Sequence, residues 1–303
     1  DGTWGQYYGA PGDLSTSIEC YFALKASGIP TSATGMVKAR EFIVGSGGIA
    51  NARVFTKIWL ALFGQYRWEA VPTIPPELIL LPHWVPMNPY DFASWARATM
   101  LPLSIVFAYR PIRTISPNMS LDELLPSSPL VQEEFRGVPK HVFGWEKTFR
   151  FADAFLRWYT TWPLKIGRAY SIRRVKEWII SHQEEDGSWG GIQPPWAYSL
   201  IALHQVGYSI DHPVVATGLD GFRNTWSKLS EDGQSMRIQA CLSPLWDTAL
   251  VILGLLDSGI TPTHPALQQA IRWLLKEEIR TKGDWAVKIP KVEPSGWAFE
   301  FEN

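Results

Sequence analysis

The fold is decided by the stretch Ala202-Leu203-His204-Gln205-Val206-Gly207 and by His212-Pro213, which follows it five residues later. Apolar residues lead into Gly207, and glycine ends helices readily because it adopts the left-handed backbone conformation just beyond the last turn. Proline suits the first turn of the next helix, where an amide hydrogen would have no helical partner. The stretch therefore predicts an apolar helix, a tight turn at Gly207 and a second helix that begins at Pro213.

The same helix ending recurs along the chain. Three other apolar segments run into Gly28, Gly64 and Gly259, and Gly259 is followed five residues later by His264-Pro265. Apolar helices that alternate with amphipathic ones are typical of an α/α toroid; a solenoid is the alternative, although it usually keeps a tighter period. Strict alternation of apolar and polar residues is rare, so sheets are not favoured. We predict an all-α fold, an α/α toroid of paired inner and outer helices.

The composition excludes several classes of protein. The 303 residues are 46% hydrophobic and 19% charged, which is incompatible with a disordered chain. A net charge of −1 offers no basic field to hold nucleic acid. Cys20 and Cys241 lie far apart without a Cys/His cluster, so we expect no disulfide framework, no metal site and no cofactor. The sequence contains no run of 18 apolar residues, so it predicts no membrane-spanning helix.

A second motif explains part of the unusual content of 16 tryptophans. A helical pattern that contains Trp178 is followed by Gln183 and then by Gly187-Ser188-Trp189. Physically, the glutamine can cap a neighbouring helix end while the indole stacks over it. A degenerate copy ends in Gly283-Asp284-Trp285, with Glu278 in place of the glutamine, and Asp1-Gly2-Thr3-Trp4 looks like the end of a third. We assign five tryptophans of these copies to stability: Trp4, Trp178, Trp189, Trp273 and Trp285.

This Gln…Gly-x-Trp pattern resembles the QW motif of the triterpene cyclases. Three stretches, 91–99, 187–196 and 243–248, look like the bacterial squalene–hopene cyclases, and the resemblance covers nearly the whole chain. It implies two α/α toroids, one inserted into the chain of the other, around a large apolar cavity. It also implies conversion of squalene to a pentacyclic hopanoid by proton-initiated cation cyclisation. We expect residues 1–290 to form the inserted toroid and residues 291–303 to begin the return segment into the catalytic toroid.

The acid that starts this reaction in the family is absent from the sequence. In the family, an Asp-x-Asp-Asp segment follows a Gly-x-Ala-Phe-x-Phe-x-Asn run, which here is residues 296–303. We therefore expect the chain to be a piece of a longer intramolecular transferase, whose missing catalytic toroid is its partner. Alone, the piece should be inactive.

The resemblance also implies which residues line the cavity. Trp246 and Phe299 would face the migrating cation, which aromatic faces stabilise through cation–π attraction. Phe92 would lie at the constriction of the substrate channel, and Trp95 nearer the tail of the folded substrate. A tryptophan at helical spacing is otherwise usually a packing residue. The remaining candidates for binding squalene or a related polyprenoid are Ile192, Gln193, Pro194, Pro195, Tyr198 and Glu300.

Residues 142–164 interleave aromatic with basic side chains, a pattern that suits a helix lying in a bilayer interface. With the resemblance, this predicts a peripheral, monotopic protein on the cytoplasmic side of a membrane. The alternative is a helix of the toroid wall. We also consider a homodimer.

Two other functions compete with a cyclase. A protein prenyltransferase toroid also binds isoprenoid chains, but it needs a zinc site from Asp, Cys and His that the cysteine spacing disfavours. A non-catalytic toroid that binds lipid or serves as a scaffold stays open, because the initiating acid is absent from the chain.

Overall fold

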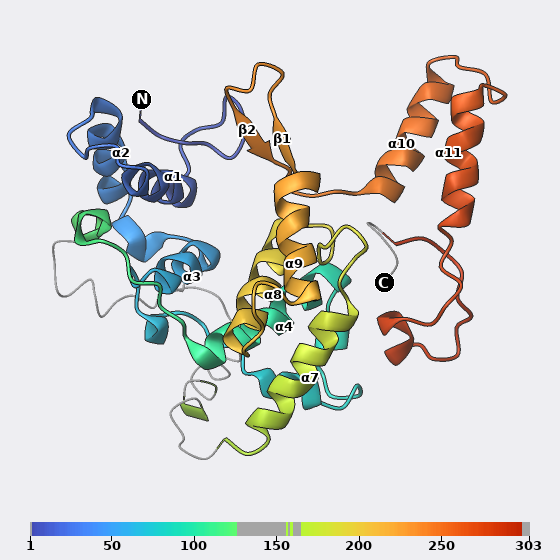
Figure 1. Cartoon of the computed structure of the whole chain (residues 1–303), viewed down its shortest axis with the longest axis horizontal. Helices are drawn as coiled ribbons and strands as arrows, with labels where there is room; N and C mark the ends of the chain where they lie inside the picture. The colour runs from blue at the N-terminus through green and yellow to red at the C-terminus, as the bar shows by residue number, and fades with distance from the viewer. Residues whose placement is uncertain (1, 126–155, 157, 160–164, 299–303) are drawn as a thin grey trace, which may run out of the picture. The chain divides into compact units, whose positions relative to one another are not determined.

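The computed structural model describes residues 2–125, 156, 158–159 and 165–298, and these residues are mostly helical (Figure 1). The prediction of an all-helical class is confirmed. The chain divides into two compact units, and each is described by itself. Unit 1 comprises residues 1–73 and 110–161, and unit 2 comprises residues 74–109 and 162–303.

Unit 1 is built from α1 (Leu14–Ala26), α2 (Thr34–Gly45) and α3 (Val54–Leu62). Asp13 caps α1, because its carboxylate accepts a hydrogen bond from the Thr16 amide at 2.7 Å. The core between these helices contains fully buried Ile18, Tyr21 and Ile43. Short turns complete the unit: η1 (Gly48–Asn51), η2 (Trp68–Ala70), η5 (Pro117–Met119) and η6 (Asp122–Leu124).

Unit 2 contains the longer helices α4 (Ser94–Tyr109), α7 (Arg168–Ser181), α8 (Gln193–Gln205), α9 (Pro213–Asp220), α10 (Pro244–Asp257) and α11 (Pro265–Lys276). Helix α4 packs along α8, and the core beside them buries Trp189, Trp196 and Trp226 completely. Four short elements connect the helices: η3 (Pro76–Leu80), η4 (Pro89–Asp91), η7 (Gly221–Thr225) and η8 (Asp284–Val287). None of the described helices is both long and apolar enough to cross a bilayer.

The sheet in the described part of unit 2 is a two-stranded antiparallel hairpin of β1 (Ser227–Leu229) and β2 (Met236–Ile238). Leu229 pairs with Met236, and both side chains are exposed. The sheet is therefore as small as the sequence led us to expect.

The predicted helix endings are confirmed. Gly28, Gly64, Gly207 and Gly259 all have positive φ, and each follows the end of α1, α3, α8 or α10 by two residues. Pro213 opens α9 and Pro265 opens α11, as the His-Pro pairs predicted. The two histidines differ in detail: the His264 ring accepts a hydrogen bond from the Ala266 amide at 3.3 Å, whereas the His212 side chain makes no capping bond.

Candidate functional site

The loop of residues 190–195 lies against the first turn of α4 in unit 2, and its last three residues, Gln193 to Pro195, form the first turn of α8 rather than irregular chain. A Cβ placed on Gly190 would lie 3.3 Å from the Ala98 Cβ and 3.8 Å from the Trp95 Cα. Only a residue without a side chain allows this approach at a φ of +65°. The structure thus brings Trp95 beside the loop that contains Ile192, Gln193, Pro194 and Pro195.

The loop is held from its other side by residues 239–242. The Gln193 amide donates to the Ala240 carbonyl at 3.2 Å, and the Leu242 amide donates to the Gly191 carbonyl at 2.9 Å. The Gln193 side chain adds a bond from Nε2 to the Gln239 carbonyl at 2.6 Å. Because residues 239–242 lead directly into α10, these bonds connect the loop to the helix that carries Trp246.

The candidate residues differ in how much of their side chains is accessible. Trp95 and Trp246 are 56% and 57% exposed. Phe92, Ile192 and Gln193 are half-buried and Pro194 is exposed. Pro195 and Tyr198 are buried within unit 2, and Tyr198 is only 1% exposed. Phe299 and Glu300 lie outside the described residues.

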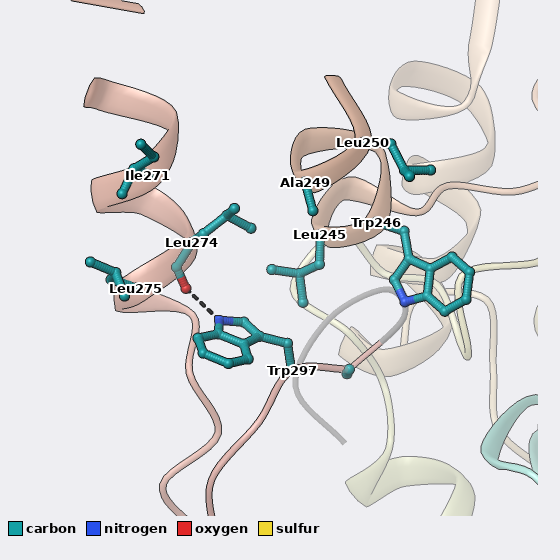
Figure 2. Close-up of a pocket in the computed structure, with 9 residues that line it drawn as sticks. Leu245, Trp246, Ala249, Leu250, Ile271, Leu274, Leu275 and Trp297 are labelled. Carbon is teal, nitrogen blue, oxygen red and sulfur yellow. Dashed lines mark hydrogen bonds between the residues drawn. The ribbon is translucent and has the colours of Figure 1, made fainter. Parts of the chain in front are cut away.

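An apolar groove of about 450 Å³ runs between α10 and α11. Leu245 projects from α10 toward Leu274 of α11, and the Trp297 ring lies near both, as Figure 2 shows. The indole of Trp297 is fixed by a hydrogen bond from Nε1 to the Leu274 carbonyl at 2.6 Å. Trp246 belongs to the lining, whose side chains are all apolar. Such a surface suits a hydrocarbon, because no lining group needs a hydrogen-bond partner from the ligand.

A charged cluster beside α4 was missed by the sequence reasoning. Asp284 lies in the degenerate Gly-x-Trp copy, and its carboxylate pairs with Arg97 of α4 at 2.8 Å. Burial opposes ionisation of Asp284, but His182, Arg97 and Trp178 outweigh it and hold the pKa of this carboxyl below its usual value. A signal was present, because Arg97 is the one charged residue of α4 and a buried charge requires a partner.

Two further expectations concern metals and membranes. Among the described residues, no three His, Cys, Asp or Glu side chains gather as metal ligands. Most of the aromatic and basic segment 142–164 lies outside the described residues, and of its tryptophans the structure describes Trp158, which is half-exposed.

Comparison with protein families identifies the chain. Residues 1–231 match the squalene-hopene cyclase N-terminal domain, and residues 242–303 match the squalene-hopene cyclase C-terminal domain. The chain therefore belongs to the squalene–hopene cyclase family, as its resemblance implied.

Individual relatives agree with this assignment. The whole chain is 42% identical to a squalene–hopene cyclase of Alicyclobacillus acidocaldarius, of which it covers 47%. It is 37% identical to a dammaradiene synthase of Dryopteris crassirhizoma and 35% identical to a squalene–hopene cyclase of Bradyrhizobium diazoefficiens, again over its whole length, and covers 43% and 46% of them. The chain thus spans about half the length of these relatives.

Proposed function

We propose that this chain is the part of a triterpene cyclase that forms the wall of the substrate cavity, the substrate channel and the surface for membrane docking. The complete enzyme would convert squalene to a pentacyclic hopanoid by proton-initiated cyclisation. In this proposal residues 1–290 form the inserted α/α toroid, and residues 291–303 begin the return into the catalytic one. Family membership and the names of the relatives support the reaction class.

The observation that carries the proposal is the arrangement around Trp246. This residue stands on α10 in the lining of the apolar groove and is 57% exposed. A carbocation needs a dry surface that stabilises positive charge without offering a base, and an indole face supplies about 2 kcal/mol or more when desolvated. Trp246 is therefore the residue we assign to cation stabilisation, together with Phe299.

The other candidates would shape the substrate rather than stabilise charge. The Trp95 backbone adjoins the loop 190–195, and we assign its exposed side chain to one patch with Ile192, Gln193 and Pro194. Phe92, which directly follows η4 and lies two residues before α4, would form the constriction of the channel. Pro195 and Tyr198 would support this patch from within unit 2. Glu300 would continue the cavity wall beyond Phe299.

The choice of product would lie outside this chain. One relative is called a squalene–hopene cyclase and another a dammaradiene synthase, and both align over all 303 residues. We therefore propose that this segment supplies features common to the family, while contacts in the other half of the enzyme select the product. The proposed location is a peripheral, monotopic position on the cytoplasmic side of a membrane.

The test uses the chain alone and within a complete cyclase that contains it. Alone, residues 1–303 should not cyclise squalene, because protonation of an alkene needs a positioned general acid. In the complete enzyme, Trp246→Ala and Phe299→Ala should slow cyclisation or release incompletely cyclised products, and Phe299→Tyr should be milder. Trp84→Ala, at a 76% exposed position outside the site, is the control.

Gas chromatography with mass spectrometry would measure the products. Turnover by the chain alone would mean that it contains an acid we have not identified. Normal products from both alanine variants would show that Trp246 and Phe299 do not stabilise the cation and only contribute to packing. Binding of squalene by the chain, with no effect of these variants on the complete enzyme, would favour a lipid-binding toroid.

A further inference from the structure

Asp284 is the centre of a cluster that joins three separate segments of unit 2. Its Oδ2 atom accepts hydrogen bonds from Arg97 Nε at 2.8 Å and from Trp178 Nε1 at 3.0 Å, and it lies 3.2 Å from His182 Nε2. Arg97 comes from α4, Trp178 from α7, and His182 directly follows α7. The Arg97 and Asp284 side chains are only 7% and 14% exposed, so solvent screens this pair little.

The two donors from the end of α7 are themselves fixed. The rings of Trp178 and His182 are stacked with centroids 3.9 Å apart. The His182 Nδ1 atom lies 2.8 Å from the Trp178 carbonyl, while Nε2 faces the Asp284 carboxylate. The Ser181 hydroxyl also lies 3.0 Å from Nδ1, so contacts at both ring nitrogens hold the His182 ring in place. The stacked rings of Trp178 and His182 therefore present both nitrogens to the Asp284 carboxylate together.

Arg97 carries the effect of Asp284 to a different part of the chain. While its Nε donates to the carboxylate, its Nη1 donates to the Phe92 carbonyl at 3.0 Å. The guanidinium also lies 5.3 Å from the centre of the Tyr90 ring. A guanidinium is planar, so fixing one edge also fixes the direction of the other donors. By orienting the Arg97 guanidinium, Asp284 thus helps to hold the Phe92 carbonyl in position.

A second contact connects the same two segments four residues further along. Lys288 Nζ pairs with Asp91 Oδ1 at 2.5 Å and also donates to the His83 carbonyl. Asp284 and Lys288 lie at the two ends of η8. The short helix is therefore attached at both ends to the region of residues 83–97.

We propose that Asp284 is a positioning residue, which acts through Arg97 to fix the backbone turn that presents Phe92 and Trp95. The structural part of this inference stands on the contacts within unit 2. Its consequence for substrate, a constriction of fixed width, rests on the proposed function. Asp284 does not need to touch the substrate to have this effect.

The test uses the 303-residue chain and separates the two hydrogen bonds of Arg97, one to the Asp284 carboxylate and one to the Phe92 carbonyl. Arg97→Lys keeps a positive charge near Asp284 but removes the bond to Phe92, because an ammonium cannot reproduce the forked geometry. Amide hydrogen exchange at Phe92 and Arg97 should become at least about tenfold faster, while the amides of Ala286 in η8 and of Lys288 directly after it keep their protection. Asp284→Asn should accelerate exchange in both segments and shift the indole N–H resonance of Trp178.

Asp257→Asn is the matched control, because it removes the same charge from an exposed position at the end of α10. It should leave exchange in both segments unchanged. Unchanged exchange at Phe92 in both Arg97→Lys and Asp284→Asn would overturn the inference. If Asp284→Asn fails to fold, Arg97→Lys still decides it, because that variant keeps the charge.

Squalene in detergent micelles then tests the link to function separately. If exchange at Phe92 accelerates and squalene binds at least about threefold more weakly to Arg97→Lys, both the positioning role and the proposed channel are supported. If exchange accelerates and binding is unchanged, Asp284 is still a positioning residue, and the assignment of Phe92 to the channel fails.

Discussion

The indole of Trp189 donates a hydrogen bond from Nε1 to the carbonyl of Ile179 at 2.7 Å, and the Trp189 side chain is fully buried. Ile179 lies in the last turn of α7, where carbonyls lack ordinary helical partners. Gln183 reaches in the other direction, because its Nε2 donates to the Val214 carbonyl in the first turn of α9 at 2.8 Å. The segment between Gln183 and Trp189 therefore attaches the end of α7 to the start of α9.

Truncation of Trp189 should destabilise unit 2 strongly. We expect Trp189→Ala to lower the free energy of unfolding by about 3–5 kcal/mol, because a large buried side chain is removed. Trp189→Phe should cost about 1–3 kcal/mol, since the Ile179 carbonyl then keeps only the longer bond from the His182 amide, at 3.3 Å. Urea denaturation followed by circular dichroism measures both, with exposed Trp84→Ala as the control. A loss below about 1 kcal/mol for Trp189→Ala would show that the motif is not structural.

Gly187 should tolerate a methyl group less well than Gly207 does. Both have positive φ, so alanine should cost about 1–2 kcal/mol at either position through backbone strain. A Cβ on Gly187 would also lie 2.4 Å from the Thr217 carbonyl oxygen of α9, whereas nothing lies within 4 Å of one on Gly207. Gly187→Ala should therefore cost about 1–3 kcal/mol more than Gly207→Ala. Equal melting temperatures of the two variants would contradict this close contact.

Membrane docking is testable without any cyclisation. If residues 142–164 form the docking surface, the chain should co-float with anionic liposomes, because aromatic and basic side chains both favour that interface. Trp158→Glu combined with Trp162→Glu should abolish flotation, and Trp84→Glu should not. Normal flotation of the double variant would assign the segment to the toroid wall instead.

Unit 1 should lose stability at alkaline pH through Tyr21. Burial, together with the Glu123 carboxylate that accepts its hydrogen bond at 2.9 Å, raises the pKa of Tyr21 to about 12, and Arg40 opposes this only in part. Between about pH 10 and 12 the unfolded chain releases this proton while the folded chain keeps it, so stability falls as pH rises. Tyr21→Phe should make the slope of the unfolding free energy against pH shallower, by up to the contribution of about one proton. An identical slope for the variant in denaturant titrations across that range would refute the assignment.

The helices and their endings could be predicted from the sequence because their signals are local. Gly207 and Pro213 act on their own backbone, so neighbouring residues are enough to place both the end of α8 and the start of α9. The tryptophans were harder. Trp226 sits in no repeat, but it is fully buried and its Nε1 donates to the Asp186 carboxylate at 2.9 Å. That pairing depends on the tertiary fold.

The candidate site was predictable only in part for the same reason. Trp95 and the loop 190–195 are far apart in the sequence, and spacing alone gives no information about the contact at Gly190. Arg97 could have been recognised as a buried charge that needs a partner, yet nothing in the sequence indicates that the partner is Asp284. Long-range pairs of this kind are set by packing of whole helices.

The hydrogen bonds between residues 239–242 and the loop that begins α8 also bear on how such enzymes can be recombined. The two family domains end and begin at residues 231 and 242, which makes this interval an attractive crossover point for chimeras. Yet the carbonyls of Gln239 and Ala240 hold Gln193, and the Leu242 amide holds Gly191. A crossover at this point would combine the loop from one parent with its supporting segment, residues 239–242, from another. Crossovers before Gly190 would keep both sides of this pairing from the same parent.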